Sequence, residues 1–194
     1  MELPIFPLQT VLFPGSALPL RVFEQRYMDM VKDCLKDEQP FGICLIAAGA
    51  EVGVPAMPYP VGVTARIVSW DMQQLGVLNI VVRGEQRFRI LNQHTTPQGL
   101  LRAEVAIIPE AQVQSVPEPL RVLLPLLQAM ASEVGPERMP PPHQFEDAAW
   151  VGYRFAEMLP IPPFARQKLL ELDDPQSRLE IVRKFLEQRG LVVY

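Results

Sequence analysis

Prolines dominate the start of the chain and limit what it can fold into. Four of them fall within the first 19 residues, at Pro4, Pro7, Pro14 and Pro19. Proline lacks a backbone N–H and clashes with the preceding turn of a helix, so an early helix is excluded. The short apolar runs between these prolines therefore predict extended segments at the edge of a sheet, with a turn at 14–15.

The pattern changes after this proline-rich start. Leu18, Leu20 and Val22 alternate at period two, which predicts a strand. From residue 24 to Leu35 the apolar side chains recur at helical spacing, which predicts an amphipathic helix of about four turns. The stretch 3–31 thus predicts broken strands that lead directly into a helix.

Alternating apolar and polar residues continue to about residue 110. They predict further strands at 41–47, 61–70, 77–83, 85–91 and 101–107. Between these strands the sequence predicts loops at 48–60, 71–76 and 92–99, and a bulge or bend at Gly84. About six strands with hairpin spacing and one helix favour an antiparallel barrel that is closed or nearly closed.

The second half of the chain has a helical pattern. Beyond a linker at 112–119, helices are predicted at 120–134, 144–159, 163–172 and 175–189. The first of them is apolar on nearly every face, which predicts a buried helix that Pro125 kinks or delays. Asp174 and Pro175 provide an N-cap and a first-turn proline for the last. We expect a β-barrel at 1–112 and a helical part at 113–194.

Several motifs resemble one known family. The opening stretch carries Leu-Pro-Ile-Phe-Pro-Leu at 3–8, Phe-Pro-Gly at 13–15 and Phe-Glu-Gln-Arg-Tyr at 23–27. In this order and spacing they resemble the start of the N-terminal, substrate-binding (LON) domain of Lon proteases. Segments 61–67, 83–90 and 159–180 resemble later parts of that domain. The resemblance implies an α+β fold, in which a PUA-like antiparallel β-barrel with one helix is followed by a C-terminal helical bundle.

The sequence offers little for catalysis or for a cofactor. It contains no Gly-Lys pair, so it has no P-loop for ATP. No serine lies in a Gly-x-Ser-x-Gly motif, and the Ser-Lys protease domain of Lon proteases has no counterpart here. His94 and His143 fall in separate loops, and Cys34 and Cys44 lack metal-ligand spacing. We therefore expect no enzyme, no cofactor and no metal, with both cysteines as free buried thiols.

The net charge and the hydropathy of the chain limit the kinds of partner that it is expected to bind. The formal net charge is -4, which weighs against contacts to nucleic-acid phosphates. The N-terminus lacks a basic region, its apolar stretch is interrupted by prolines, and no later stretch is long enough to span a membrane. We expect a soluble, cytoplasmic protein with neither signal peptide nor membrane segment. The sequence does not indicate the oligomeric state.

The remaining interpretation is a non-catalytic protein- or peptide-binding module. Its resemblance to the LON domain implies recognition of unfolded or exposed apolar protein segments, or of a protein partner, with a link to protein quality control. Two loops carry apolar side chains suited to such contacts, and the candidate residues are Met57, Tyr59, Met72 and Leu75. Two alternatives remain open: an RNA-binding PUA-like protein, and a small-ligand enzyme whose site is assembled from scattered residues.

Overall fold

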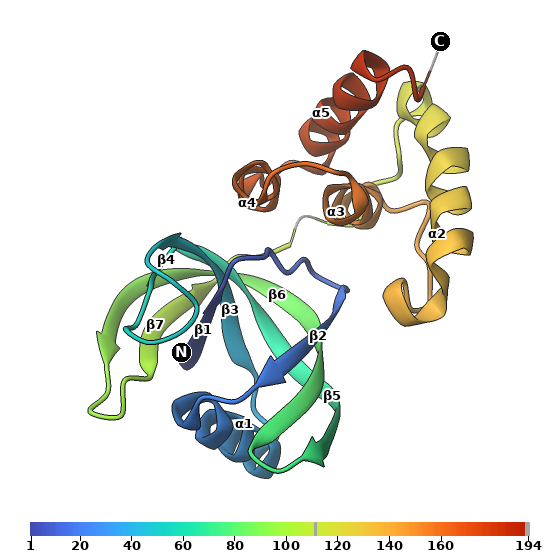
Figure 1. Cartoon of the computed structure of the whole chain (residues 1–194). Coiled ribbons are helices and arrows are strands. Elements are labelled where there is room, and N and C mark those ends of the chain that lie inside the picture. The colour runs from blue at the N-terminus through green and yellow to red at the C-terminus, as the bar shows by residue number, and fades with distance from the viewer. Residues whose placement is uncertain (111, 193–194) are drawn as a thin grey trace. The chain divides into compact units, whose positions relative to one another are not determined.

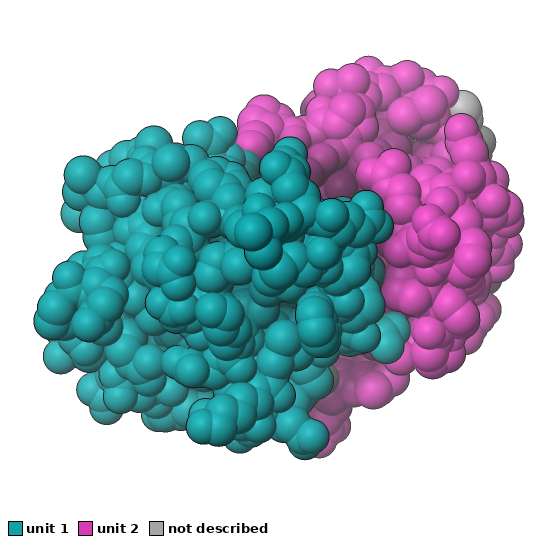
Figure 2. Space-filling model, turned by 60° about the horizontal axis from the view of Figure 1, so that its bottom comes forward, with its two compact units in different colours: residues 1–109 teal, residues 110–194 magenta. Residues whose placement is uncertain are grey.

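The computed structural model describes residues 1–110 and 112–192, which divide into two compact units (Figure 2). Unit 1 comprises residues 1–109 and unit 2 comprises residues 110–194. Unit 1 contains β1 (Glu2–Leu8), β2 (Ala17–Val22), α1 (Gln25–Asp37), β3 (Phe41–Ala48), β4 (Met57–Pro58), β5 (Val61–Gln74), β6 (Val77–Thr95) and β7 (Leu101–Ile107) (Figure 1). Unit 2 contains η1 (Glu118–Leu123), α2 (Leu124–Arg138), α3 (Ala148–Met158), α4 (Pro163–Glu171) and α5 (Pro175–Gln188).

The strands of unit 1 form a barrel-like ring (Figure 1). Hydrogen-bonded neighbours follow the order β1-β7-β6-β5-β3, and β1 also pairs with β3, which closes the ring. All of these pairings are antiparallel except that of β1 with β3, which is parallel. β2 and β4 add to β6 and β3 outside the ring. The predicted α+β fold with a strand barrel is confirmed.

The prediction that the first strand lies at a sheet edge is wrong. β1 has a neighbour on each side, and its two prolines are accommodated by a change of partner along its length. Pro4 faces Arg102 of β7, where the pairing with β3 has not yet begun. Pro7 faces Cys44 of β3, where the pairing with β7 has already ended. Each proline therefore has one side on which no ladder hydrogen bond is required of it.

The interior of the ring is filled by apolar side chains from several strands. They are Leu3, Ile5, Cys44, Phe88, Leu101, Ala103 and Val105. Helix α1 lies where the sequence predicted it and packs through its apolar face. Tyr27 stacks on Phe6 of β1 with ring centroids 4.0 Å apart, and Phe6 lies 6.3 Å from Phe41 of β3.

The β5–β6 hairpin is longer than the sequence predicted. Gln74 pairs with Val77, so the loop is only Leu75–Gly76, and positions 71–74 belong to β5. β6 likewise continues to Thr95 through the first half of the predicted loop at 92–99. Cross-strand pairing extended both strands, because polar residues fit a ladder as long as their backbone groups find partners.

Gly84 lies at an irregularity in β6, as predicted. The β5–β6 register shifts between Val63 and Ala65. The Gly84 N–H donates to Ser16 O at 2.9 Å, and its carbonyl accepts from Gly15 N at 2.8 Å. A Cβ at Gly84 would overlap the carbonyl oxygen of Phe13. The Phe-Pro-Gly turn and this glycine therefore fix one another.

The core of unit 2 is formed by side chains from η1, α2, α3 and α5 and from the segments that connect them. The buried members are Val116, Leu120, Leu123, Leu127, Ala131, Met139, Ala148, Val151, Phe155, Leu159, Leu179, Val182 and Leu186. The predicted cap at the start of α5 is observed, and α3 begins with a second cap. The Asp174 carboxylate accepts from Ser177 N at 2.9 Å, and the Asp147 carboxylate accepts from Ala149 N at 3.0 Å. The second cap places the start of α3 at Ala148, four residues later than the pattern at 144–159 predicted.

The prediction of a buried helix at 120–134 is wrong. A 3-10 helix, η1, precedes α2, and Pro125 lies in the first turn of α2, so the proline delays the helix and does not kink it. Within α2 only Leu127 and Ala131 are buried. Leu124, Leu126, Met130 and Val134 are only partly buried and pack against the core of unit 2. Among the described residues, no helix combines the length and apolar character needed to cross a membrane.

The two cysteines are free and buried, as expected. Burial, with a smaller contribution from Asp33, raises the pKa of the Cys34 thiol to about 11. Burial raises the pKa of Cys44 further. Both thiols therefore stay protonated at neutral pH, and protonated thiols are poor nucleophiles.

We expect native protein at pH 8 to react slowly with Ellman's reagent, at a rate set by opening of the fold, and urea-unfolded protein to react at once. Above pH 9 the thiols of the unfolded chain ionise while Cys34 in the folded chain stays protonated up to about pH 11. The unfolded state then binds fewer protons, so the free energy of unfolding should fall over this range. Rapid stoichiometric labelling of native protein at pH 8 would contradict the prediction.

Candidate functional site

The structure does not bring the four candidate residues together. Met57 lies in β4, and Tyr59 follows it, with its N–H donating to Leu45 O at 2.8 Å. Met72 and Leu75 lie at the tip of the β5–β6 hairpin. β4 pairs with the end of β3 that neighbours the start of β5, so the two pairs stand at opposite ends of unit 1 (Figure 1). They do not form one groove.

An apolar row crosses the sheet near the hairpin tip. The strands lie in the order β2-β6-β5, and Leu20, Ile80 and Trp70 are direct partners across them. Ile80 is buried, whereas Trp70 at the outer end is 59% exposed. A hollow of about 320 Å³ lies here and is lined by all three together with the polar residues Arg21, Asp71 and Asn79. Trp70 is therefore an accessible aromatic side chain beside a hollow with both apolar and polar lining.

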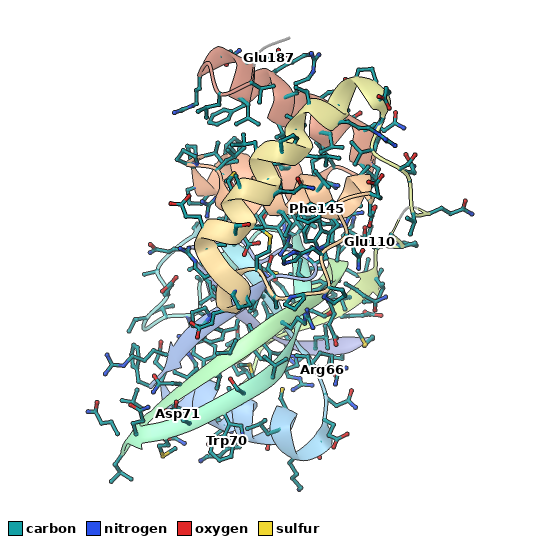
Figure 3. The ribbon with its side chains drawn as sticks, turned by 90° about the vertical axis from the view of Figure 1, so that its right-hand side faces the viewer. Arg66, Trp70, Asp71, Glu110, Phe145 and Glu187 are labelled. Carbon is teal, nitrogen blue, oxygen red and sulfur yellow. The ribbon has the colours of Figure 1, made fainter. Side chains whose placement is uncertain are left out.

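A polar row lies beside the apolar one. Arg21, Asn79 and Asp71 are partners across the same three strands. Asn79 donates a hydrogen bond to the Asp71 carboxylate at 3.1 Å. Arg66 lies nearer the barrel and Asp71 nearer the tip (Figure 3). The hollow beside Trp70 is therefore lined by residues of the polar row as well as of the apolar row.

The outer edge of β5 is open along this row. β3 pairs with β5 only as far as the Phe41–Ala65 partners. The next residue, Arg66, donates from its guanidinium to Glu38 O at 2.9 Å. From 67 to 74, β6 is the only strand that pairs with β5 among the described residues. This edge presents unpaired backbone groups, which an added extended chain could use.

Sequence reasoning named Met72 and Leu75 as candidates but did not name Trp70. Leu75 at the turn is 94% exposed. Trp70 was assigned to the last position of a strand that ended there. Met72 could have pointed to Trp70. In a strand that continues past Trp70, residues two apart lie on the same face, so Trp70 and Met72 would share one face.

Histidine, cysteine and carboxylate side chains are the usual ligands of metal ions in proteins. Among the described residues, no three His, Cys, Asp or Glu side chains are placed to hold a metal ion. His94 is exposed, with Nε2 4.0 Å from a Glu2 carboxylate oxygen. His143 Nε2 lies 3.0 Å from Met139 O, and its ring packs near Phe145.

The fold defines a class of α+β domains with a barrel-like ring of strands. The chain belongs to one family of this class. The model of the ATP-dependent protease La (LON) substrate-binding domain matches residues 2–188, which include most of both units. The resemblance drawn from the opening stretch is thereby confirmed.

Curated relatives of the chain include Lon proteases and protein cereblon. A Lon protease of Anaeromyxobacter dehalogenans is 27% identical over 201 residues, which cover 96% of this chain and 23% of that protein. Protein cereblon of Danio rerio is 27% identical over 149 residues, covering 74% of this chain and 33% of that protein. The chain thus spans about a quarter to a third of the length of these curated relatives.

Solved structures match over nearly the whole chain. A Lon N-terminal domain protein from Xanthomonas campestris is 35% identical with a TM-score of 0.80, covering 95% of this chain and 98% of that chain. The N-terminal domain of a Mycobacterium avium complex Lon protease has a TM-score of 0.69 at 19% identity, which supports the fold alone.

Proposed function

We propose that this protein recognises exposed apolar segments of other proteins and does not cleave them. The observation that carries the proposal is the apolar row of Leu20, Ile80 and Trp70, which ends at the open edge of β5. An extended chain added along 67–74 would gain main-chain hydrogen bonds, which are independent of sequence. Its apolar side chains would pack on Trp70, Met72 and Leu75.

The family supports this proposal. The matching model is named a substrate-binding domain, and apolar segments are the part of an unfolded protein that a native protein hides. Strand addition accepts many sequences, because the backbone supplies the hydrogen bonds and side chains only tune the affinity. A partner that displays one apolar strand would bind in the same way. A role in protein quality control would follow from such recognition.

We expect the pure protein to bind fluorescein-labelled, reduced and carboxymethylated α-lactalbumin and to ignore its native form. Trp70→Thr should weaken binding about tenfold or more, because truncation of a central aromatic contact costs about 2 kcal/mol. Threonine suits a strand, so β5 should keep its structure. Fluorescence anisotropy measures the binding, and gel electrophoresis with and without ATP should show the probe intact.

The matched control is Leu91→Thr, which changes another exposed apolar residue of unit 1, at a position of β6 outside the apolar row. It should leave the affinity within about twofold. Equal affinity of Trp70→Thr and the unchanged protein would refute this site. Cleavage of the probe would refute the non-catalytic role.

A further inference from the structure

Unit 2 contains an apolar groove that the strand-addition proposal does not use. It lies between α4 and α5, has a volume of about 480 Å³, and its apolar lining includes Leu159, Ile161, Phe164, Leu172, Ile181 and Phe185. Phe164 is 58% exposed and Ile181 is 46% exposed. Pockets of this size and character hold apolar ligands in many proteins.

The walls of the groove are held in place by hydrogen bonds from arginines. Arg178 of α5 is buried and donates from Nε to Leu169 O at 2.9 Å, and from a terminal nitrogen to Leu172 O. Arg166 of α4 donates to Leu159 O at 3.1 Å. These contacts tie both ends of α4 to their surroundings. The groove is therefore preformed, which lowers the entropy cost of filling it.

Cations flank both phenyl rings of the groove. Lys168 Nζ lies 5.5 Å from the centre of the Phe164 ring, and the Arg189 guanidinium lies 4.4 Å from that of Phe185. Lys168 is also paired with Glu171 at 2.9 Å, so their charges offset each other. Arg189 makes no ion pair with a carboxylate among the described residues. The rim therefore has an excess positive charge at Arg189.

Helical geometry places this charge on the groove side of α5. At 100° per residue, Arg189 falls within about 40° of both Val182 and Phe185, which line the groove. The charged positions Glu180 and Lys184 fall on the opposite side. An occupant of the groove would thus meet Arg189 and not the acidic side chains of α5.

The walls are helices, and this decides the conformation of the occupant. The main-chain groups of α4 and α5 are mostly bonded within each helix, so the groove offers an entering chain few backbone partners. A chain in an apolar groove must then satisfy its own backbone groups, which a helix does. An extended chain would leave them unpaired.

We propose that the α4–α5 groove binds an amphipathic helix of a partner protein, with apolar residues on one face and a carboxylate near Arg189. This goes beyond the proposed strand addition, because it assigns a second site, in unit 2, to a different conformation of the bound chain. A partner could bind here through a folded helix while an unfolded segment occupies the β5 edge.

The test uses a fluorescein-labelled amphipathic peptide of about four helical turns, with Leu on one face and Glu at one end. We expect saturable binding by the full chain. Phe164→Ala and Ile181→Glu, both at exposed positions, should weaken it about tenfold or more. Val113→Gln, an exposed change elsewhere in unit 2, and Trp70→Thr should leave it unchanged. The last control separates this site from the β5 edge.

Exchange of the charge at position 189 tests the orientation of the bound helix. Arg189→Glu should weaken binding of the Glu-ended peptide and strengthen that of a Lys-ended one, with circular dichroism to confirm an unchanged fold. Proline in the middle of the peptide prevents a helix. If such a peptide binds equally well, the proposal that the groove binds a helix is wrong. Self-association of the chain that Ile181→Glu abolishes, seen by sedimentation, would assign the groove to a second copy and overturn the proposal.

Discussion

Replacement of Phe88 by alanine should lower the free energy of unfolding of unit 1 by about 3–5 kcal/mol. Phe88 lies in β6, is fully buried and belongs to the apolar interior of the ring. Its ring covers two glycines of neighbouring strands: a Cβ at Gly42 or at Gly62 would lie 2.7 or 2.8 Å from it. The two glycines have no side chains that could fill the space, so the alanine variant leaves a cavity.

The two glycines should respond differently when Phe88 is shortened to leucine. At Gly42 a methyl group would meet only the ends of two side chains, Ile5 and Phe88. The cost of Gly42→Ala should therefore fall in the Phe88→Leu background. At Gly62 the methyl group would also meet the backbone carbonyl of Ile43, which cannot move aside, so Gly62→Ala should stay as costly.

Urea unfolding of the single and double variants measures this coupling as a double-mutant cycle. Leu91→Ala, at an exposed position of β6, is the control and should change stability by less than about 0.5 kcal/mol. Equal coupling at both glycines would mean that Phe88 does not cover them as described.

Replacement of Arg178 by methionine should destabilise unit 2 by about 3–5 kcal/mol. The fully buried guanidinium donates hydrogen bonds to the carbonyls of Leu169 and Leu172 at the end of α4, and stacks on the Tyr153 ring at 4.1 Å. Hydrogen bonds from charged donors contribute about 1.5–3 kcal/mol each. Methionine keeps an apolar stem but leaves both carbonyls buried without these donors.

Hydrogen exchange of the α4 amides, read by mass spectrometry, locates the effect and should show faster exchange there. Lys184→Met is the matched control on the exposed side of α5 and should change stability by less than about 0.5 kcal/mol. Because Arg178 holds one wall of the groove, its loss should also abolish binding of the amphipathic peptide. If the α4 amides of the variant exchange as slowly as those of the unchanged protein, Arg178 does not anchor α4.

Local features of the chain could be predicted from the sequence alone. The period-two and helical patterns placed α1, α4, α5 and most strands. Asp174 and Pro175 marked the start of α5 because a cap acts within one turn of its helix. The motifs of the opening stretch indicated the family, and one of them forms a local turn, in which Ser16 N donates to Phe13 O at 3.1 Å.

The pairing between segments that are distant in sequence could not be predicted from the sequence. Only the structure decided that β1 joins both β3 and β7, so that its prolines lie inside a ring and not at an edge. The same pairing extended β5 past Trp70 and placed Met57 and Tyr59 far from Met72 and Leu75. Strand register depends on partners far away in sequence, and a short pattern does not contain them.

The sequence by itself determined the α+β class, the family, and which segments are strands or helices, because these depend on neighbouring residues and on the proline positions. The tertiary structure alone decided what is exposed. It buried Arg178 and left Trp70 open beside Ile80, and it brought Phe164 and Phe185 together around a groove. Burial and grooves arise from contacts between elements, which is why the open edge of β5 beside Trp70 and the α4–α5 groove emerged only from the folded chain.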